Sequence, residues 1–140
     1  MIVLDTNVIA ELMLPRPEPK VVAWADCLAP GTAGHTSMNE AEILHGIARL
    51  PEGRRREALQ RSWDTLLPAL FHERVWAFDR EAAHWYAGVL RQRECLGRPM
   101  TTADAVIAAT TLARSARLAT RNVADFEGIG IDLINPWQAP

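Results

Sequence analysis

The stretch MIVLDTNVIAEL, residues 1–12, contains the features that decide the fold. Residues 2–4 (IVL) form a short aliphatic run, which predicts a β-strand. The polar group at residues 5–7 (DTN) follows directly and supplies side chains typical of a helix N-cap. Residues 8–12 (VIAEL) then place apolar side chains at helical spacing. The stretch therefore predicts a strand that leads directly into a helix, which is the repeating unit of an α/β fold.

The rest of the chain alternates between the same two kinds of segment. Strands and helices that alternate in this way are joined by right-handed crossovers, which place the strands parallel and the helices on both faces of the sheet. The fold class predicted is α/β, a three-layer α/β/α sandwich with a short, mostly parallel sheet. The further strands are predicted over 32–38, 118–119 and 131–134, a brief apolar segment over 75–78, helices over 21–28, 43–50, 59–70, 82–90 and 105–113, and one helical turn over 122–127.

The composition indicates one folded domain over residues 1–140, since 49% of the residues are hydrophobic and 23% are charged. A chain of this length can bury enough surface to fold without disulfides or a structural metal. The net charge of -2 excludes a polybasic protein that binds nucleic acid over its whole surface. The two cysteines form no framework, and we find no secretory signal or apolar run of bilayer length. These features predict a cytoplasmic protein that does not span a membrane.

Three acidic residues lie where a predicted strand passes into a helix, which is the edge of a parallel sheet that binds ligands. Asp5 ends the first strand, Glu42 falls in the first turn of the third helix, with Asn39 as its N-cap, and Asp104 falls in the first turn of the buried helix. Each acid alone is explained by helix capping. Together they would repel one another unless a cation lay between them. Oxygen ligands without a histidine or cysteine cluster favour Mg²⁺, with Mn²⁺ as a substitute, and phosphodiester hydrolysis as the chemistry.

The sequence resembles PIN-domain ribonucleases, specifically VapC toxins of the FitB-like subgroup in type II toxin–antitoxin systems. The resemblance covers essentially the whole chain, as a single PIN domain, and its strength comes from the order and spacing of the motifs. The matching pieces are MIVLDTNVIAELM (1–13), HTSMNEAEILHGIARLPEGRRREAL (35–59) and GRPMTTADAVIAATTLARSARLATRNVADFEGIGIDLINPW (97–137).

The resemblance implies a role for each matching residue. Asp5, Glu42 and Asp104 would hold magnesium directly or through water, and Asn122 occupies the fourth, usually acidic or amide, position. Asn122 is neutral, which leaves open whether one metal or two are bound. The residues implied to support the acids, unless they are ordinary cap and turn residues, are Thr6, Asn7, Ser37, Thr120 and Asp125. Arg98 and Arg121 are candidates for phosphate contact, with solvated surface arginine as the alternative.

The function implied is a magnesium-dependent endoribonuclease that acts as a toxin, with RNA, including transfer RNA, as its substrate. The implied partners are a second copy of the chain and a VapB-like or FitA-like antitoxin, through which alone the toxin would contact DNA. A catalytically weak PIN module that serves as a corepressor or scaffold in an antitoxin–DNA complex is the alternative, and the neutral Asn122 favours it. A phosphatase of the haloacid dehalogenase kind would require an acid where Asn7 stands.

Overall fold

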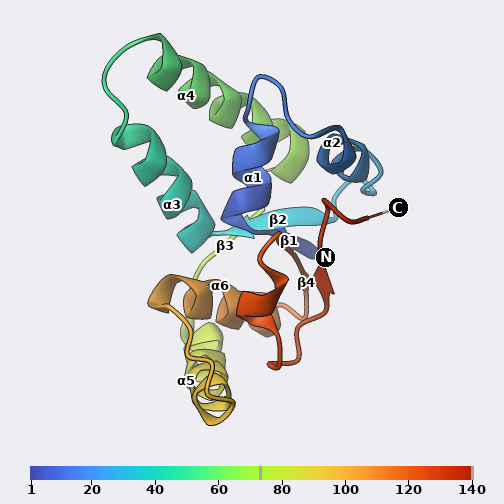
Figure 1. Ribbon diagram of the computed structural model, residues 1–140, viewed down its shortest axis with the longest axis vertical. Coiled ribbons are helices and arrows are strands. Elements are labelled where there is room, and N and C mark those ends of the chain that lie inside the picture. The colour runs from blue at the N-terminus through green and yellow to red at the C-terminus, as the bar shows by residue number, and fades with distance from the viewer. Residues whose placement is uncertain (73, 140) are drawn as a thin grey trace.

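The computed structural model describes residues 1–72 and 74–139 and contains one sheet of five parallel strands (Figure 1). The strand order is β3–β2–β1–β4–β5, which places the first strand at the centre. Val3 of β1 lies between Gly34 of β2 and Leu118 of β4 in the register. The strands are β1 (Ile2–Leu4), β2 (Ala33–Thr36), β3 (Val75–Trp76), β4 (Arg117–Ala119) and β5 (Leu133–Ile134).

In the part of the chain that the structure describes, six α-helices cover the two faces of this sheet, and the predicted three-layer α/β/α architecture is confirmed (Figure 1). One face carries α1 (Thr6–Leu12), α2 (Pro19–Asp26), α3 (Ser37–Ala48) and α4 (Arg54–Leu66). The other face carries α5 (Arg80–Cys95) and α6 (Thr102–Ala113), with α6 nearer the sheet. None of the helices in the described chain is long and apolar enough to cross a membrane.

Side chains alternate between the two faces of β1, and this alternation divides the core. Leu4 packs into a cluster with α1, α3 and α4, whereas Val3 packs into a second cluster with α5 and α6. The predicted burial of the last long helix is confirmed, because residues 105–111 of α6 are all buried. Both clusters reach the central strand, so the residues that follow β1 are fixed from both sides of the sheet.

Several boundaries differ from the prediction, and the helix expected over 21–28 spans Pro19–Asp26. The third helix begins at Ser37 and is capped by Thr36, with Asn39 as the N3 partner of the capping box, so the expected N-cap at Asn39 is wrong. The strand expected over 32–38 ends at Thr36, because the residues that follow already have helical conformation. The helix expected over 59–70 begins at Arg54 and ends at Leu66, and a π-helical turn continues it over Leu67–Phe71.

Candidate carboxylate site

Asp5 lies at the junction of β1 and α1, where its side chain caps the helix by accepting a hydrogen bond from the Thr6 N–H at 2.8 Å. Only 5% of its surface is exposed. Its second oxygen accepts hydrogen bonds from the Thr120 hydroxyl at 2.7 Å and from the Asn7 amide at 3.2 Å. The Asn39 amide lies 3.4 Å from the first oxygen. These four donors hold the carboxylate in one orientation.

Burial, together with smaller contributions from the charges of Asp104 and Glu42, raises the pKa of Asp5 to about 6. The hydrogen bonds from Thr120 and Thr6 oppose this shift because they stabilise the ionised form. Burial also raises the pKa of Asp104, and Glu42 acts on that carboxyl in the same direction. The three predicted acids therefore lie close enough to one another to interact electrostatically.

A chain of hydrogen bonds connects the first and second acids. The Thr6 hydroxyl donates to Oε1 of Glu42 at 2.7 Å, and the amide of Asn39 donates to the same hydroxyl oxygen at 3.0 Å. Asn39 is fully buried and accepts hydrogen bonds from the backbone N–H and the hydroxyl of Thr36. Thr6, predicted as a support for the acids, thus contacts Asp5 through its backbone and Glu42 through its side chain.

The sequence predicted Asn39 only as a helix cap and did not indicate its contacts with Asp5 and Thr6. The feature of the sequence that could have indicated these contacts is an amide side chain in the first turn of a helix that directly follows a buried strand. Because α3 begins earlier than expected, Glu42 lies in the second turn of the helix and is exposed. Asp104 lies in the first turn of α6 as predicted, with its backbone N–H 3.2 Å from the Thr101 hydroxyl.

Thr120 connects the site to the segment after β4. Its buried hydroxyl donates to Asp5 and accepts a hydrogen bond from the backbone N–H of Asn122 at 3.1 Å. The side-chain oxygen of Asn7 accepts from the backbone N–H of Arg121 at 3.1 Å. Asn7 and Thr120 therefore support the acid and the segment after β4 together, which agrees with the positions predicted for them.

Asn122 and Asp125 are exposed and lie at η2, a 3₁₀ turn over Val123–Phe126. Asp125 is close enough to Asp104 for its charge to raise the pKa of that carboxyl. Ser37, by contrast, is exposed at the start of α3, and among residues 1–72 and 74–139 we find no side-chain hydrogen bond from it to an acid. The structure thus brings Asp125 to the acids and leaves Ser37 at the surface.

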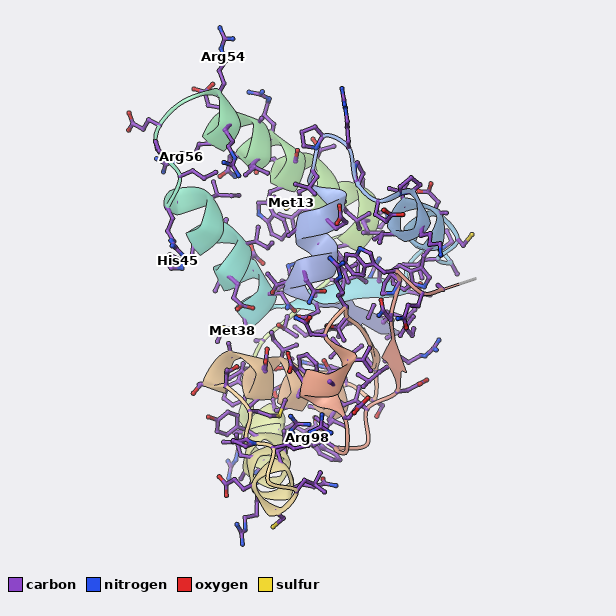
Figure 2. All side chains as sticks on the ribbon, viewed as in Figure 1. Met13, Met38, His45, Arg54, Arg56 and Arg98 are labelled. Carbon is purple, nitrogen blue, oxygen red and sulfur yellow. The ribbon has the colours of Figure 1, made fainter. Side chains whose placement is uncertain are left out.

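The predicted phosphate contacts already have partners within the protein. The guanidinium of Arg121 stacks on Trp137, 5.0 Å from the ring centroid. Arg98 donates to the Ala124 carbonyl at 3.0 Å and pairs with Glu127 at 3.4 Å. Figure 2 shows Arg98 in the lower part of the molecule beside α5, whereas Arg54 and Arg56 lie at the far end of α4. The arginine run of α4 is therefore remote from Arg98.

The side chains present suit a hard divalent cation better than a soft one. The donors are carboxylate oxygens, and the raised pKa of Asp5 shows that its negative charge is costly in this place. A cation would relieve that cost. Within the described residues, no three His, Cys, Asp or Glu side chains already form a metal-binding group. The acids interact through their charges at longer range than ligands of one ion do.

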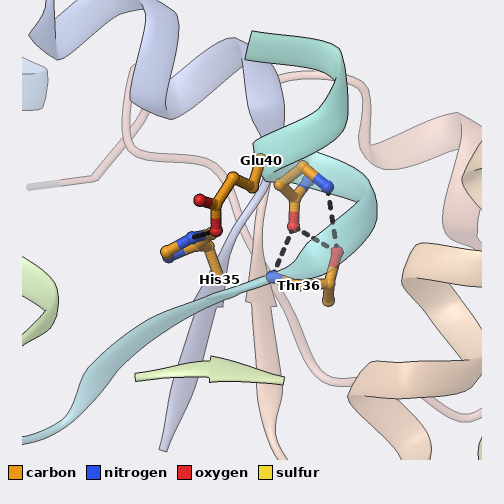
Figure 3. A network of polar contacts seen from close by, with 4 residues as sticks. His35, Thr36 and Glu40 are labelled. Atoms are coloured by element: carbon orange, nitrogen blue, oxygen red, sulfur yellow. Dashed lines mark hydrogen bonds and ion pairs between the residues drawn. The ribbon is translucent and has the colours of Figure 1, made fainter. Parts of the chain in front are cut away.

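His35 is fully buried and pairs with the partly exposed carboxylate of Glu40. Its ring lies between Trp63 and Phe71, with centroids 5.4 and 4.5 Å away, and Nε2 is 3.1 Å from Oε2 of Glu40 (Figure 3). Burial lowers the pKa of His35 below its ordinary 6.5, and the hydrogen bond and charge of Glu40 only partly oppose this shift. His35 is thus a core residue that packs against two aromatic side chains.

The lowered pKa predicts how His35 contributes to stability. Below pH 6.5 the unfolded chain binds the proton more readily than the folded one, so the contribution of His35 is present above that pH and is lost as the pH falls. We expect the difference in unfolding free energy between the wild type and His35→Gln to shrink between pH 8 and pH 5.5 in urea titrations. The control is His45→Gln, at an exposed position of α3 (Figure 2). The unfolding free energy of this variant should differ from that of the wild type by the same amount at pH 8 and pH 5.5.

Comparison with known proteins places this geometry in a family. Residues 2–130 match the PIN domain family. The chain is 41% identical to VapC ribonuclease Y4jK of Sinorhizobium fredii, over 99% of each chain, and 34% identical to toxin FitB of Neisseria gonorrhoeae, over 98% of this chain and 99% of that one. The solved structure of FitAB bound to an IR36 DNA fragment superposes with a TM-score of 0.91 at 35% identity, over 100% of this chain and 98% of that chain. The chain, with its acids at the carboxyl edge of a parallel sheet, belongs to the PIN domain family.

Proposed function

We propose that this protein is a metal-dependent endoribonuclease that acts as the toxin of a type II toxin–antitoxin system. The observation that carries the proposal is the buried Asp5 carboxylate, held by four donors and coupled electrostatically to Glu42 and Asp104. Relatives that align over nearly their full length bear the names VapC ribonuclease and toxin FitB. RNA is the substrate class that these names favour, and transfer RNA is a candidate within it.

Asp5, Glu42 and Asp104 would hold Mg²⁺ or Mn²⁺, with Asn122 offering a neutral amide oxygen at the fourth position. The ion would supply an activated water and stabilise negative charge on the phosphate oxygens. The hydrogen bonds that Thr120 and Thr6 donate to the Asp5 carboxylate fix its orientation and favour its ionised form. Asn122 adds no charge, so the proposal includes one tightly held ion and does not depend on a second.

In this proposal the substrate binds to the exposed surface next to the acids. Arg121 follows Thr120 directly, is exposed, and places its guanidinium over the ring of Trp137. A guanidinium stacked in this way retains N–H donors at its edge, which suit a phosphate oxygen. Arg98 is a weaker candidate, because the Ala124 carbonyl and the Glu127 carboxylate occupy its donors.

The proposed partner is a small VapB-like or FitA-like antitoxin that places a basic segment against the acids. A cation from the partner would offset the charge that raises the pKa of Asp5, as the metal does, and would exclude substrate. In this proposal the toxin forms a homodimer, works in the cytoplasm and contacts DNA only through the antitoxin. The solved FitAB complex with a DNA fragment supports that arrangement by analogy.

The test is cleavage of total RNA and transfer RNA by antitoxin-free protein with Mg²⁺, Mn²⁺ or EDTA. Discrete cuts that need the metal and disappear in EDTA are expected. Absence of cuts with either metal, in protein shown to be folded by circular dichroism, contradicts the proposal and favours the corepressor alternative, for which the neutral Asn122 argues. Binding of operator DNA by the antitoxin with and without this protein then tests that alternative.

A further inference from the structure

Arg93 is a charged residue that is buried in the layer formed by α5 and α6. It lies on the buried side of α5 together with Ala82 and Val89, and 4% of its surface is exposed. Its Nε has no hydrogen-bond partner among the residues that the structure describes. Burial of a guanidinium costs free energy unless its donors are bound, and an apolar side chain would fill the same space at lower cost. The contacts that Arg93 does make must therefore offset that cost.

These contacts go to the backbone around η2. Nη1 of Arg93 donates to the carbonyl oxygen of Glu127 at 2.8 Å and to that of Ala124 at 3.3 Å. Arg98 donates to the same Ala124 oxygen, and its own backbone N–H binds the carbonyl of Arg93 at 2.9 Å. The end of α5 thus holds the turn through charged donors, which make stronger hydrogen bonds than neutral ones.

The turn held in this way contains Asp125, which lies near Asp104. Phe126, with 1% of its surface exposed, anchors the turn in the core, but it constrains the turn at one point only. On the other side, Thr120 binds the backbone of Asn122, as described above. The hydrogen bonds of Arg93 are the buried polar contacts that connect the turn to α5.

We infer that Arg93 is a positioning residue of the carboxylate site: through the Ala124 and Glu127 carbonyls it holds η2 so that Asp125 stays beside Asp104. Arg93 touches neither substrate nor metal in this role. The inference rests on the proposed metal site, since it assigns Arg93 the task of placing one of the acids around it. An apolar residue at position 93 would pack in the core but would release the turn.

The experiment compares Arg93→Met with the wild type by calorimetric titration of Mn²⁺ and by hydrogen–deuterium exchange of residues 120–128. We expect Mn²⁺ affinity to fall about 10- to 100-fold, the range for residues that orient ligands, and exchange in that segment to rise. Arg93→Lys should restore most of the affinity, because Nζ can donate to both carbonyls. Arg91→Met, at an exposed position of the same helix, should bind Mn²⁺ as the wild type does.

Val89→Ala separates positioning from general loss of stability, because Val89 lies on the same buried side of α5 as Arg93 but its apolar side chain makes no hydrogen bond to η2. It should lower the melting temperature without weakening Mn²⁺ binding. Wild-type affinity in Arg93→Met, or an equal loss of affinity in Val89→Ala, would overturn the inference. A wild type that binds Mn²⁺ but cuts no RNA would refute the proposed nuclease function, while the calorimetry would still decide the role of Arg93.

Discussion

RNA cleavage is expected to fall about a hundredfold or more in Asp5→Asn and in Asp104→Asn, since residues that merely orient ligands already account for about 10- to 100-fold. Each substitution keeps the shape of the side chain but removes a negative charge from the proposed metal site. We expect the larger loss of RNA cleavage in Asp5→Asn, because four donors fix the orientation of Asp5 and it lies at the centre of the sheet edge. Initial rates on transfer RNA with saturating Mn²⁺ measure the effect.

The fold of Asp5→Asn is expected to persist and, without metal, to become more stable at pH 8. The pKa of Asp5 is raised from 3.8 to about 6 in the folded protein, so its contribution to stability is present below pH 3.8 and is lost as the pH rises through 6. Such a shift corresponds to at most about 3 kcal/mol, of which about 1 kcal/mol is expected to remain after the altered hydrogen bonds. Urea unfolding in EDTA at pH 5 and pH 8 measures it.

Asp26→Asn is the matched control for both measurements, because Asp26 is exposed at the end of α2. It should cleave RNA and unfold as the wild type does. Normal cleavage by both Asp5→Asn and Asp104→Asn would show that the carboxylate site is wrong. A large loss of stability in Asp5→Asn would instead show that the charge of Asp5 supports the fold.

Trp63→Ala is expected to lower the unfolding free energy by about 3–5 kcal/mol, the range for large aromatic residues removed from a core. Trp63 lies on α4 with 2% of its surface exposed and packs in the cluster that joins α4 to β1 and β2. Its ring also meets His35 edge-on, so a cavity would open beside a buried polar group. Urea titration at pH 7.5 gives the difference directly.

Trp85→Ala provides the comparison, because Trp85 on α5 is 44% exposed. Its loss should cost about 1 kcal/mol or less, as for partly exposed side chains. The fraction of Trp63→Ala that remains folded should still cut RNA, since no hydrogen bond of Asp5 involves α4 within the described chain. Equal stability of the two tryptophan variants would contradict the packing described for α4.

The sequence predicted the parts of the fold that depend on local pattern. The β1–Asp5–α1 junction and the buried α6 follow from an aliphatic run, a capping residue and continuous apolar spacing, all within about a dozen residues. The start of α3 was misplaced because both Thr36 and Asn39 can cap a helix. Only the buried partners of Asn39 decide between them.

The proposed site was predictable at Asp5, which follows a strand, and at Asp104, which lies in the first turn of α6, although the element before α6 is the helix α5 and not a strand. The residues that connect the acids were harder to predict from the sequence, because Asn39, Thr120 and Arg93 act through contacts between segments far apart in the chain. Of these three residues Arg93 is the hardest to predict from the sequence, since arginine on a helix is commonly solvated. Its burial follows from the packing of α5 on α6, which no local pattern reveals.

The central place of β1 has a consequence for the time at which the site can form during synthesis. Asp5 leaves the ribosome before Thr120, whose hydroxyl holds it and which lies 115 residues later. Strand β4, which flanks β1, also comes from this late part of the chain. A nascent chain that has not yet reached Thr120 therefore lacks one of the four donors to Asp5 and the strand on one side of β1, so the complete site forms only after that later part of the chain has been made.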